Sequence, residues 1–303
     1  MVVAPSGYIW DNCLAHGKTV RCYGEMVQAY IEPQASWTEL YNDFLRGTHR
    51  YRICQTTKID SLRPRLCPTS SGFPATVTDQ YRAQQFTNEL KQFEATGKMP
   101  SFMVMLLPNY HTSGTRPDIP TPRAQVADND LAVGRVIEAL SRSMFWKDTV
   151  VFITEDDPQA GIDHMDGHRT VGLVASAYSR LGGRVVSTNY NQTSMVRTIE
   201  QILGLPPMNK IDASASPMSV CFTDKADFAP FEAAANNIPL DEMNPPKASL
   251  SGDALRWAEV SANLPLDEVD ECDEDTFNRL LWASVKGYGV PYPVTTKVPH
   301  PSW

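Results

Sequence analysis

The chain has 303 residues, of which 42% are apolar and 20% charged, and its formal net charge is −8. This composition is that of a globular protein and excludes collagen, coiled-coil and wholly disordered classes. An acidic chain without a dense Lys/Arg run is not expected to have nucleic acid as its main partner. No apolar stretch approaches the roughly 20 residues that span a bilayer, so no membrane span is expected. The first residues carry neither a basic stretch nor a long apolar one, which argues against a signal peptide.

The first hundred residues are predicted to be mixed in structure. In chain order we expect a helix over 8–16, a strand over 19–23, a helix over 37–45, a long loop over 47–76 and a helix over 78–96. Ser36 is a candidate N-cap of the second helix. Gly17 and Gly97 follow the first and third helices, where glycine commonly ends a helix.

The middle of the chain predicts a βαβ unit. Residues 102–107 form a continuous apolar run between two prolines, and residues 149–154 form a second run. Such runs are typical of strands buried on both faces of a parallel sheet. Between them, helically spaced apolar residues predict a helix over 122–143, with Pro122 at its favoured first position. This order of strand, helix and strand places the chain in the α/β class.

The rest of the chain adds one strand and several helices. We expect a strand over 170–176, helices over 193–203, 253–262 and 275–285, and an irregular, proline-rich stretch over 205–251. We therefore interpret residues 1–303 as a single α/β domain, with residues 205–303 as a loop-rich wrapping tail that contains two helices.

The six cysteines leave the redox compartment open. None lies in a CxxC pair, which disfavours a zinc site made of thiolates. Cys54 and Cys67 flank a segment that looks like a loop and could form a disulfide. The alternative is that all six cysteines are reduced and mostly buried.

Two loops combine the residue types that carry chemistry. In open parallel sheets, ligands bind where loops leave the carboxyl ends of the strands. Residues 108–116 follow the first predicted strand of the βαβ unit, and residues 155–169 follow the second. These loops hold three of the six histidines of the protein, namely His111, His164 and His168. The second loop also holds five carboxylates, namely Glu155, Asp156, Asp157, Asp163 and Asp166.

This combination predicts a metal site. Carboxylates and imidazoles suit a divalent cation such as Zn, Mn, Mg or Ca. Three consecutive carboxylates repel one another unless a cation neutralises them. Asp163 or Asp166 could instead orient a histidine, and Arg116 or Arg169 could bind phosphate or pair with surplus carboxylates. The alternative to a metal site is a solvated acidic loop in which aspartates cap turns.

Several segments between Met103 and Leu205 resemble a known family in their order and spacing. They are 107–112, 127–135, 152–157, 163–169 and 193–200, while 278–282 and 291–293 resemble the end of such proteins. The family is the bacterial phosphoesterase family, which includes phospholipase C and acid phosphatase relatives and belongs to the alkaline phosphatase superfamily. The resemblance implies a three-layer α/β/α fold with a mainly parallel sheet. It also implies a metal-dependent phosphoric ester hydrolase.

The resemblance assigns roles to residues of both loops. It implies that Asp156 and Asp157 lie at one metal position, with His111, His164 and His168 near the same centre. The ion, which could be Zn, Mn or Ca, would polarise the phosphoryl group and activate a nucleophile. Thr112, His111 and Arg169 are the catalytic candidates, and Ser113 is an alternative nucleophile. A metal-bound water could also attack phosphorus directly.

The chain departs from this pattern at two places. Relatives begin with a strand that carries an acidic–Asn metal motif, followed by a loop with a Ser or Thr nucleophile, and this chain is expected to start after both. The pair Asp11–Asn12 lies in a helix-like segment and takes over no role. Tyr110 stands where relatives have Asp, so one expected metal ligand is missing. The chain is thus expected to be a shortened family member with a weakened site.

Three functional hypotheses remain at this point. The first is a metal-dependent phosphodiesterase or phosphatase that acts on a small-molecule phosphate ester. The second is a carboxyl-ester hydrolase on the same scaffold, and the third is a non-catalytic metal-binding remnant. An exposed sheet edge could allow homodimerisation. Family members are commonly periplasmic or secreted, yet a signal peptide is not expected here, so the localisation stays open.

Overall fold

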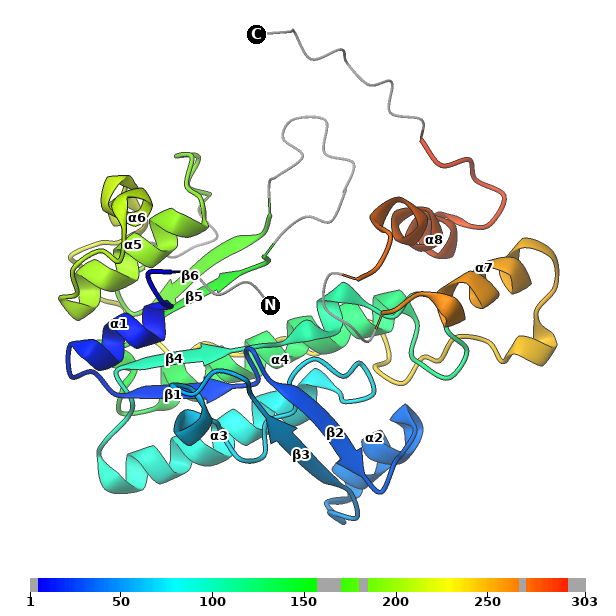
Figure 1. Ribbon diagram of the computed structural model, residues 1–303, viewed down its shortest axis with the longest axis horizontal. Helices are drawn as coiled ribbons and strands as arrows, with labels where there is room; N and C mark the ends of the chain where they lie inside the picture. The colour runs from blue at the N-terminus through cyan, green and yellow to red at the C-terminus, as the bar shows by residue number, and fades with distance from the viewer. Residues whose placement is uncertain (1–4, 157–169, 180–184, 267–270, 294–303) are drawn as a thin grey trace, which may run out of the picture.

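The computed structural model describes residues 5–156, 170–179, 185–266 and 271–293 (Figure 1). The helices are α1 Ile9–Ala15, α2 Trp37–Arg46, α3 Asp79–Thr96, α4 Pro122–Arg142, α5 Gln192–Leu203, α6 Lys210–Ser214, α7 Gly252–Asn263 and α8 Glu274–Lys286. The strands are β1 Val20–Tyr23, β2 Gln28–Glu32, β3 Arg52–Thr56, β4 Phe102–Met105, β5 Val150–Thr154 and β6 Gly172–Ser176. A short 3-10 helix, η2 Pro108–His111, follows β4.

The predicted helices are confirmed, and their end signals act as expected. The Ser36 hydroxyl accepts a hydrogen bond from the backbone N–H of Glu39 at the start of α2. Gly97 ends α3 with φ +65°, a left-handed conformation that favours glycine. Pro122 is the first residue of α4.

The prediction of a long loop over 47–76 is wrong in one part. Within that range β3 pairs with β2 in an antiparallel register that joins Gln28 to Thr56 and Glu32 to Arg52. Residues of β2 alternate between exposed and half-buried. Because neither strand has a buried face or a run of apolar residues, periodicity gives little signal for them. An ion pair between Arg52 and Glu32 joins their ends.

The α/β class is confirmed, but the strands pair differently from the expected sheet. β1 and β4 are parallel, from Val20 opposite Phe102 to Tyr23 opposite Met105. β5 and β6 are antiparallel, and the described strands form three two-stranded pairs rather than one mainly parallel sheet. The expected strand over 170–176 is present as β6, yet it runs back along β5. Glu155 N–H donates to Val171 O at 3.3 Å where the two strands part.

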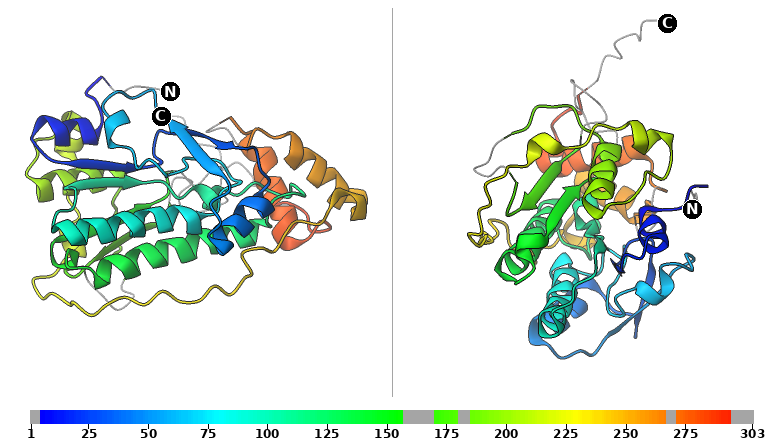
Figure 2. Two further views of the ribbon diagram at one scale, coloured as in Figure 1. Left: turned by 90° about the horizontal axis from the view of Figure 1, so that it is seen from below. Right: turned by 90° about the vertical axis from the view of Figure 1, so that its left-hand side faces the viewer.

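Helices pack on both faces of the β1–β4 pair (Figures 1 and 2). The residues that face α1 and the end of α5 are Val20, Cys22, Phe102 and Val104, which pack against Trp10, Cys13 and Leu205. The alternate residues Tyr23, Met103 and Met105 face α3 and α4. Val151 of β5 and Ala175 of β6 pack against the same α3–α4 layer. The β4 and β5 strands are thus neighbours over one helical layer without being hydrogen-bonded to each other.

The helices α7 and α8 lie at one end of the molecule (Figure 1). They form the C-terminal part of the fold, together with the long irregular stretch that precedes them. Their own core consists of Leu266, Phe277 and Leu280. Asn244, in the irregular stretch before α7, donates from its amide to the carbonyls of Gly114 and Arg116 at 3.0 and 2.9 Å. This C-terminal part therefore contacts the loop that follows β4.

The structure also tests two smaller expectations. All six cysteines lie in the described residues, and none is in a disulfide. The bond between Cys54 and Cys67 is therefore not formed, and four of the six thiols are buried. Over the described ranges, every helix is too short or too polar to cross a bilayer.

Candidate active site

His111 closes the η2 turn after β4 and is half-buried. Its Nδ1 lies 3.0 Å from the carbonyl oxygen of Thr112. A carbonyl oxygen can only accept, so Nδ1 carries a proton, and a ring with one proton keeps its lone pair on Nε2. His111 is thereby set up to bind a metal ion or accept a proton through Nε2.

Two aromatic rings fix the plane of the His111 imidazole. It stacks on Phe277 of α8, with ring centroids 5.3 Å apart and an interplanar angle of 23°. Phe73 contacts it edge-on at 5.5 Å. Phe277 is fully buried, so the imidazole rests on a rigid surface. The ring can therefore rotate little without disturbing the α7–α8 core.

Thr112 has an unusual backbone conformation, with φ +63° and ψ 166°. This region is almost restricted to glycine, and a non-glycine residue held in it costs on the order of 1–3 kcal/mol. For a β-branched residue the strain is pronounced. Its N–H donates to Asn109 O at 3.1 Å, and its Oγ1 accepts from Gly114 N–H at 3.4 Å. Accepting this bond leaves the hydroxyl proton available for transfer.

Ser113, the alternative nucleophile, is less suited to attack a substrate. Its side chain is fully buried, and its carbonyl accepts a hydrogen bond from the Ser261 hydroxyl of α7 at 3.0 Å. Within the described residues its own hydroxyl has no hydrogen-bond partner. Thr112 is also buried but keeps 6% of its surface exposed, and it directly follows His111, so it is the better candidate.

A buried polar cluster holds the other side of the η2 turn. We call it the Asp79 cluster, and it comprises Thr78, Asp79, Gln80, Arg82, Asn109, Asp128 and Asn129. Its two carboxylates are fully or almost fully buried, and so is the Arg82 guanidinium. Asn109 is the member that belongs to the turn itself. The cluster therefore joins α3 and α4 to the residues just before His111.

Burial dominates the electrostatics of this cluster. It raises the pKa of Asp79 to about 6, against the opposing effect of the Arg82 charge and with a further rise from Asp128. Burial also lowers the pKa of Arg82, which both carboxylates oppose. The group thus has one cation for two acids, and removing the Arg82 charge would leave two buried carboxylates without compensation.

The end of β5 carries the second group of predicted residues. Gln192, the first residue of α5, donates from its side-chain amide to the carbonyl of Glu155 at 3.0 Å and to that of Asp156. These bonds fix the backbone that presents the Asp156 carboxylate. The charges of Glu155 and Asp156 also change the pKa of residues at the ends of two other strands.

Three strand ends meet at this point. Glu25, two residues after β1, has a pKa that is raised by burial and by the charge of Asp156. Tyr110, in the η2 turn after β4, has a pKa that is raised by burial and by the charge of Glu155. The carboxyl ends of β1, β4 and β5 therefore share one electrostatic neighbourhood, as the loop argument from the sequence expected.

Only part of the predicted site can be placed. His111, Thr112 and Asp156 are described, whereas Asp157, His164, His168 and Arg169 lie outside the described residues. Over the part of the chain that the structure describes, no three His, Cys, Asp or Glu side chains form a metal-binding group. The predicted ligand set thus remains a prediction.

The described donors nonetheless fit a divalent cation in two respects. The Nε2 lone pair of His111 is available because Nδ1 donates to a carbonyl. The carboxylates of Glu25 and Asp156 repel each other at a partly desolvated position, as the raised pKa of Glu25 shows. A cation placed between such groups would remove this repulsion.

Sequence reasoning missed Glu25 and the Asp79 cluster. Glu25 follows a strand that was predicted, so the strand-end rule used for the later loops would have found it. Asp79 reads as an ordinary acidic residue in the first turn of a helix, and Asp128 lies on a helix without a distinguishing pattern. Their association depends on how α3 packs against α4, which no local spacing encodes.

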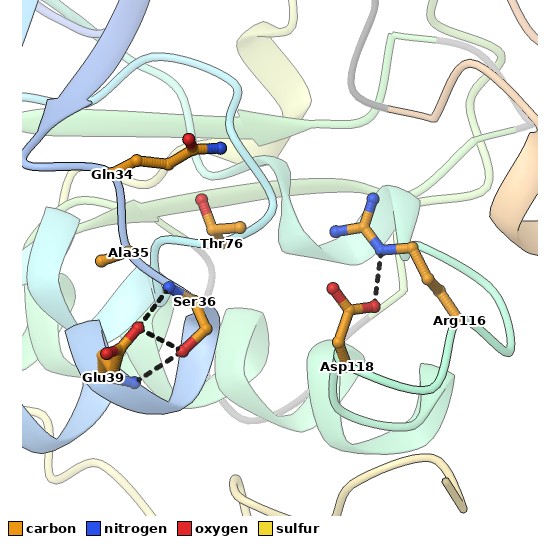
Figure 3. Close-up of a pocket in the computed structure, with 7 residues that line it drawn as sticks. All are labelled: Gln34, Ala35, Ser36, Glu39, Thr76, Arg116 and Asp118. Atoms are coloured by element: carbon orange, nitrogen blue, oxygen red, sulfur yellow. Dashed lines mark hydrogen bonds and ion pairs between the residues drawn. The ribbon is translucent and has the colours of Figure 1, made fainter. Parts of the chain in front are cut away.

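Arg116 is paired with a carboxylate, which was one of its two expected roles. Its Nε lies 3.2 Å from a carboxylate oxygen of Asp118, in a polar pocket that Gln34, Ser36, Glu39 and Thr76 also line (Figure 3). The Glu39 carboxylate accepts hydrogen bonds from the N–H and hydroxyl of Ser36. Because Arg116 is paired with Asp118 and the Glu39 carboxylate is hydrogen-bonded to Ser36, we place the candidate site at the strand ends instead.

Comparison with known proteins decides the family. The family model described as "Phosphoesterase family" matches residues 9–206, which is more than half of the chain. The chain belongs to the phosphoesterase family. No curated protein and no solved structure matches it significantly.

The phosphoesterase match includes β1, η2, β5 and the Asp79 cluster. It therefore supports hydrolysis of phosphate esters in general. Asn244, Ser261 and Phe277, which hold the far side of the η2 loop, lie beyond the matched range. The C-terminal part of this phosphoesterase thus holds one side of the η2 loop, and the matched region holds the other.

Proposed function

We propose that the protein is a metal-dependent hydrolase of small-molecule phosphate esters, either a phosphodiesterase or a phosphatase. The observation that carries the proposal is the meeting of three strand ends within the region that matches the phosphoesterase family. Glu25 and Asp156, from separate parts of the sequence, lie within electrostatic reach of each other, and so do Glu155 and Tyr110, the residue before His111. Carboxylate and imidazole donors at such an edge suit metal-assisted chemistry.

The proposed ligands are Asp156, Asp157, His164, His168 and His111, and the proposed ion is Zn, Mn or Ca. His111 has one free lone pair, on Nε2, so it either binds the ion or accepts the proton of Thr112, and does not do both at once. Glu25 adds a further carboxylate beside Asp156. When bound, the ion would supply positive charge that polarises the phosphoryl group. The protein side of this arrangement is fixed: Gln192 holds the backbone at Asp156, and the Thr112 carbonyl holds the His111 tautomer.

Thr112 is the proposed nucleophile. Thr112 directly follows His111 in a strained backbone conformation, and an imidazole Nε2 that holds no ion can accept the proton that leaves as the threonine oxygen attacks phosphorus. Arg169 is the proposed phosphate-binding cation, since guanidinium matches phosphate oxygens in pairs. The attack breaks the bond between phosphorus and the ester oxygen, the proton taken by His111 passes to the leaving oxygen, and the alcohol departs. Water then hydrolyses the phosphorylated Thr112, which releases phosphate from a monoester substrate or a phosphate monoester from a diester substrate.

We also propose that the helices on both faces of the β1–β4 pair belong to a three-layer core of the alkaline phosphatase type. In this proposal residues 1–303 form one domain, in which the tail from residue 205 wraps the core. Packing of α1 on one face and of α3 and α4 on the other supports it. A homodimer remains a proposal that sedimentation would test.

A substrate and metal panel tests the function. Protein treated with EDTA and then supplied with Zn, Mn or Ca should hydrolyse p-nitrophenyl phosphate or bis(p-nitrophenyl) phosphate only when an ion is present. The Asp156→Ala variant should lose this activity and bind the ion less tightly. Hydrolysis that survives both EDTA and Asp156→Ala would contradict the proposal. Turnover of p-nitrophenyl acetate alone would favour a carboxyl-ester hydrolase.

A further inference from the structure

Asn109 is held by hydrogen bonds from its backbone and from its side chain. Its backbone N–H donates to Asp79 Oδ2 at 3.1 Å, and its side-chain amide donates to Asp128 Oδ2 at 2.6 Å and to Val77 O at 3.2 Å. Its own carbonyl then accepts the N–H of Thr112 at 3.1 Å. A chain of hydrogen bonds therefore leads from two buried carboxylates on α3 and α4 to the strained residue.

Asp79 is the central member of this chain. Besides Asn109, its Oδ2 accepts from the Asn129 amide at 3.0 Å, and the same amide donates to Leu107 O at 2.7 Å. Its Oδ1 accepts from Arg82 at 2.9 Å. Leu107 and Asn109 flank Pro108, the first residue of η2, so Asp79 fixes the entry to the turn on both sides.

The strain at Thr112 requires such a support. A non-glycine residue remains in this backbone region only where its surroundings over-determine the conformation. Arg82 in turn is tied to the carbonyls of Gly72, Pro74 and Val77, at 3.0, 2.8 and 2.6 Å. The cluster is therefore anchored to rigid backbone and not only to other side chains.

We propose that Asp79 is a positioning residue of the active site: its carboxylate fixes the η2 turn so that His111 and Thr112 are presented in reactive geometry. The catalytic roles of His111 and Thr112 in this inference rest on the proposed function. The effect of Asp79 on the conformation of the turn does not. Asp79 touches neither Thr112 nor the His111 ring, so it acts through Asn109. A displacement of about 1 Å at reacting groups can reduce a rate about 100-fold.

The test compares Asp79→Asn with Glu89→Gln. Glu89 lies ten residues further along the same helix, about 15 Å away at the rise of an α-helix, and also pairs with a partly buried arginine, Arg21. Both variants replace a carboxylate by an amide of equal size. With Mn²⁺ supplied, Asp79→Asn should reduce kcat for p-nitrophenyl phosphate about 10- to 100-fold with little change in KM. Glu89→Gln should change kcat less than about 2-fold, since its effect is on stability alone.

A second measurement does not depend on activity. The Nδ1–H signal of His111 in a spectrum of ¹⁵N-histidine-labelled protein, identified with His111→Gln, should shift in Asp79→Asn and stay in place in Glu89→Gln. A shifted signal in a protein that hydrolyses no phosphate ester would refute the proposed function and support the positioning role. An unshifted signal with unchanged kcat would overturn the positioning role.

A milder variant covers the case in which Asp79→Asn does not fold. Asn129→Ala removes the hydrogen bonds to Asp79 and Leu107 but leaves every charge in place. It should shift the same His111 signal and reduce kcat about 3- to 10-fold. Wild-type kcat and an unmoved signal in this variant would count against the proposal.

Discussion

The loop after β4 is held from two sides, and the two sides use different physics. On the α3–α4 side, buried charges and amides bind the turn at Asn109. On the α7–α8 side, the contacts are an aromatic stack with Phe277, a close approach of Leu280 to Gly114, and neutral hydrogen bonds from Ser261 and Asn244. The charged side lies in the family match, and the neutral side lies beyond it.

The largest expected effect is on the charged side. Arg82→Met should lower the free energy of unfolding by more than about 3 kcal/mol, because two buried carboxylates then lose their cation. Arg21→Met removes a more exposed partner of Glu89 and should cost about 1 kcal/mol. Urea unfolding of both variants measures the difference. Equal losses would show that the Asp79 cluster is an ordinary ion pair.

The contact of Gly114 with Ser261 and Leu280 tests the neutral, α7–α8 side of the loop. A Cβ added at Gly114, where φ is +60°, would lie 2.6 Å from Ser261 Oγ and 2.7 Å from Leu280 Cδ2. Gly114→Ala should therefore cost about 2–3 kcal/mol, from the left-handed backbone and from overpacking. Gly97→Ala has a similar φ of +65° and no atom within 4 Å, and should cost about 1 kcal/mol. Thermal unfolding that shows equal losses would mean that α7 and α8 do not press on the loop.

The charged side should also respond to pH. Burial raises the pKa of Asp79 to about 6 from 3.8, so the protonated form is favoured by folding. Stability from this group is present at low pH and is lost as the pH rises through about 6. Between about pH 5 and pH 7, the wild type should lose about 1 kcal/mol relative to Asp79→Asn, which does not titrate there. A constant difference across this range would contradict the raised pKa.

The same contrast explains what could be predicted from the sequence. Helix ends depend on single residues such as Ser36, Gly97 and Pro122, whose effects are local, and these predictions are confirmed. Strands β2 and β3 were not found because their stability comes from pairing and an ion pair rather than from an apolar pattern. The parallel pairing of β5 was expected from its apolar run, but such a run reports burial and not strand direction.

In the candidate site, too, residues with a local signal could be predicted from the sequence and residues that depend on packing could not. His111, Thr112 and Asp156 follow strands, so the rule on strand ends predicted them, and Glu155 and Tyr110 of the two loops lie within electrostatic reach of each other. The roles of these residues stay a prediction. The Asp79 cluster joins residues 78–82 to 109 and 128–129, and only the packing of α3 on α4 brings them together. Supporting residues of this kind carry no local signature.

Thr112→Gly tests the central claim, that the loop after β4 is a strained catalytic turn, most directly. Glycine adopts the observed backbone without strain, so the variant should be more stable by about 1 kcal/mol after the entropic cost of glycine is included. Because it lacks the proposed nucleophile, its kcat for p-nitrophenyl phosphate should fall at least about 100-fold. Thr112→Ser, as the matched control, should keep most of the activity. A Thr112→Gly protein that is more stable and still turns over at the wild-type rate would contradict the account.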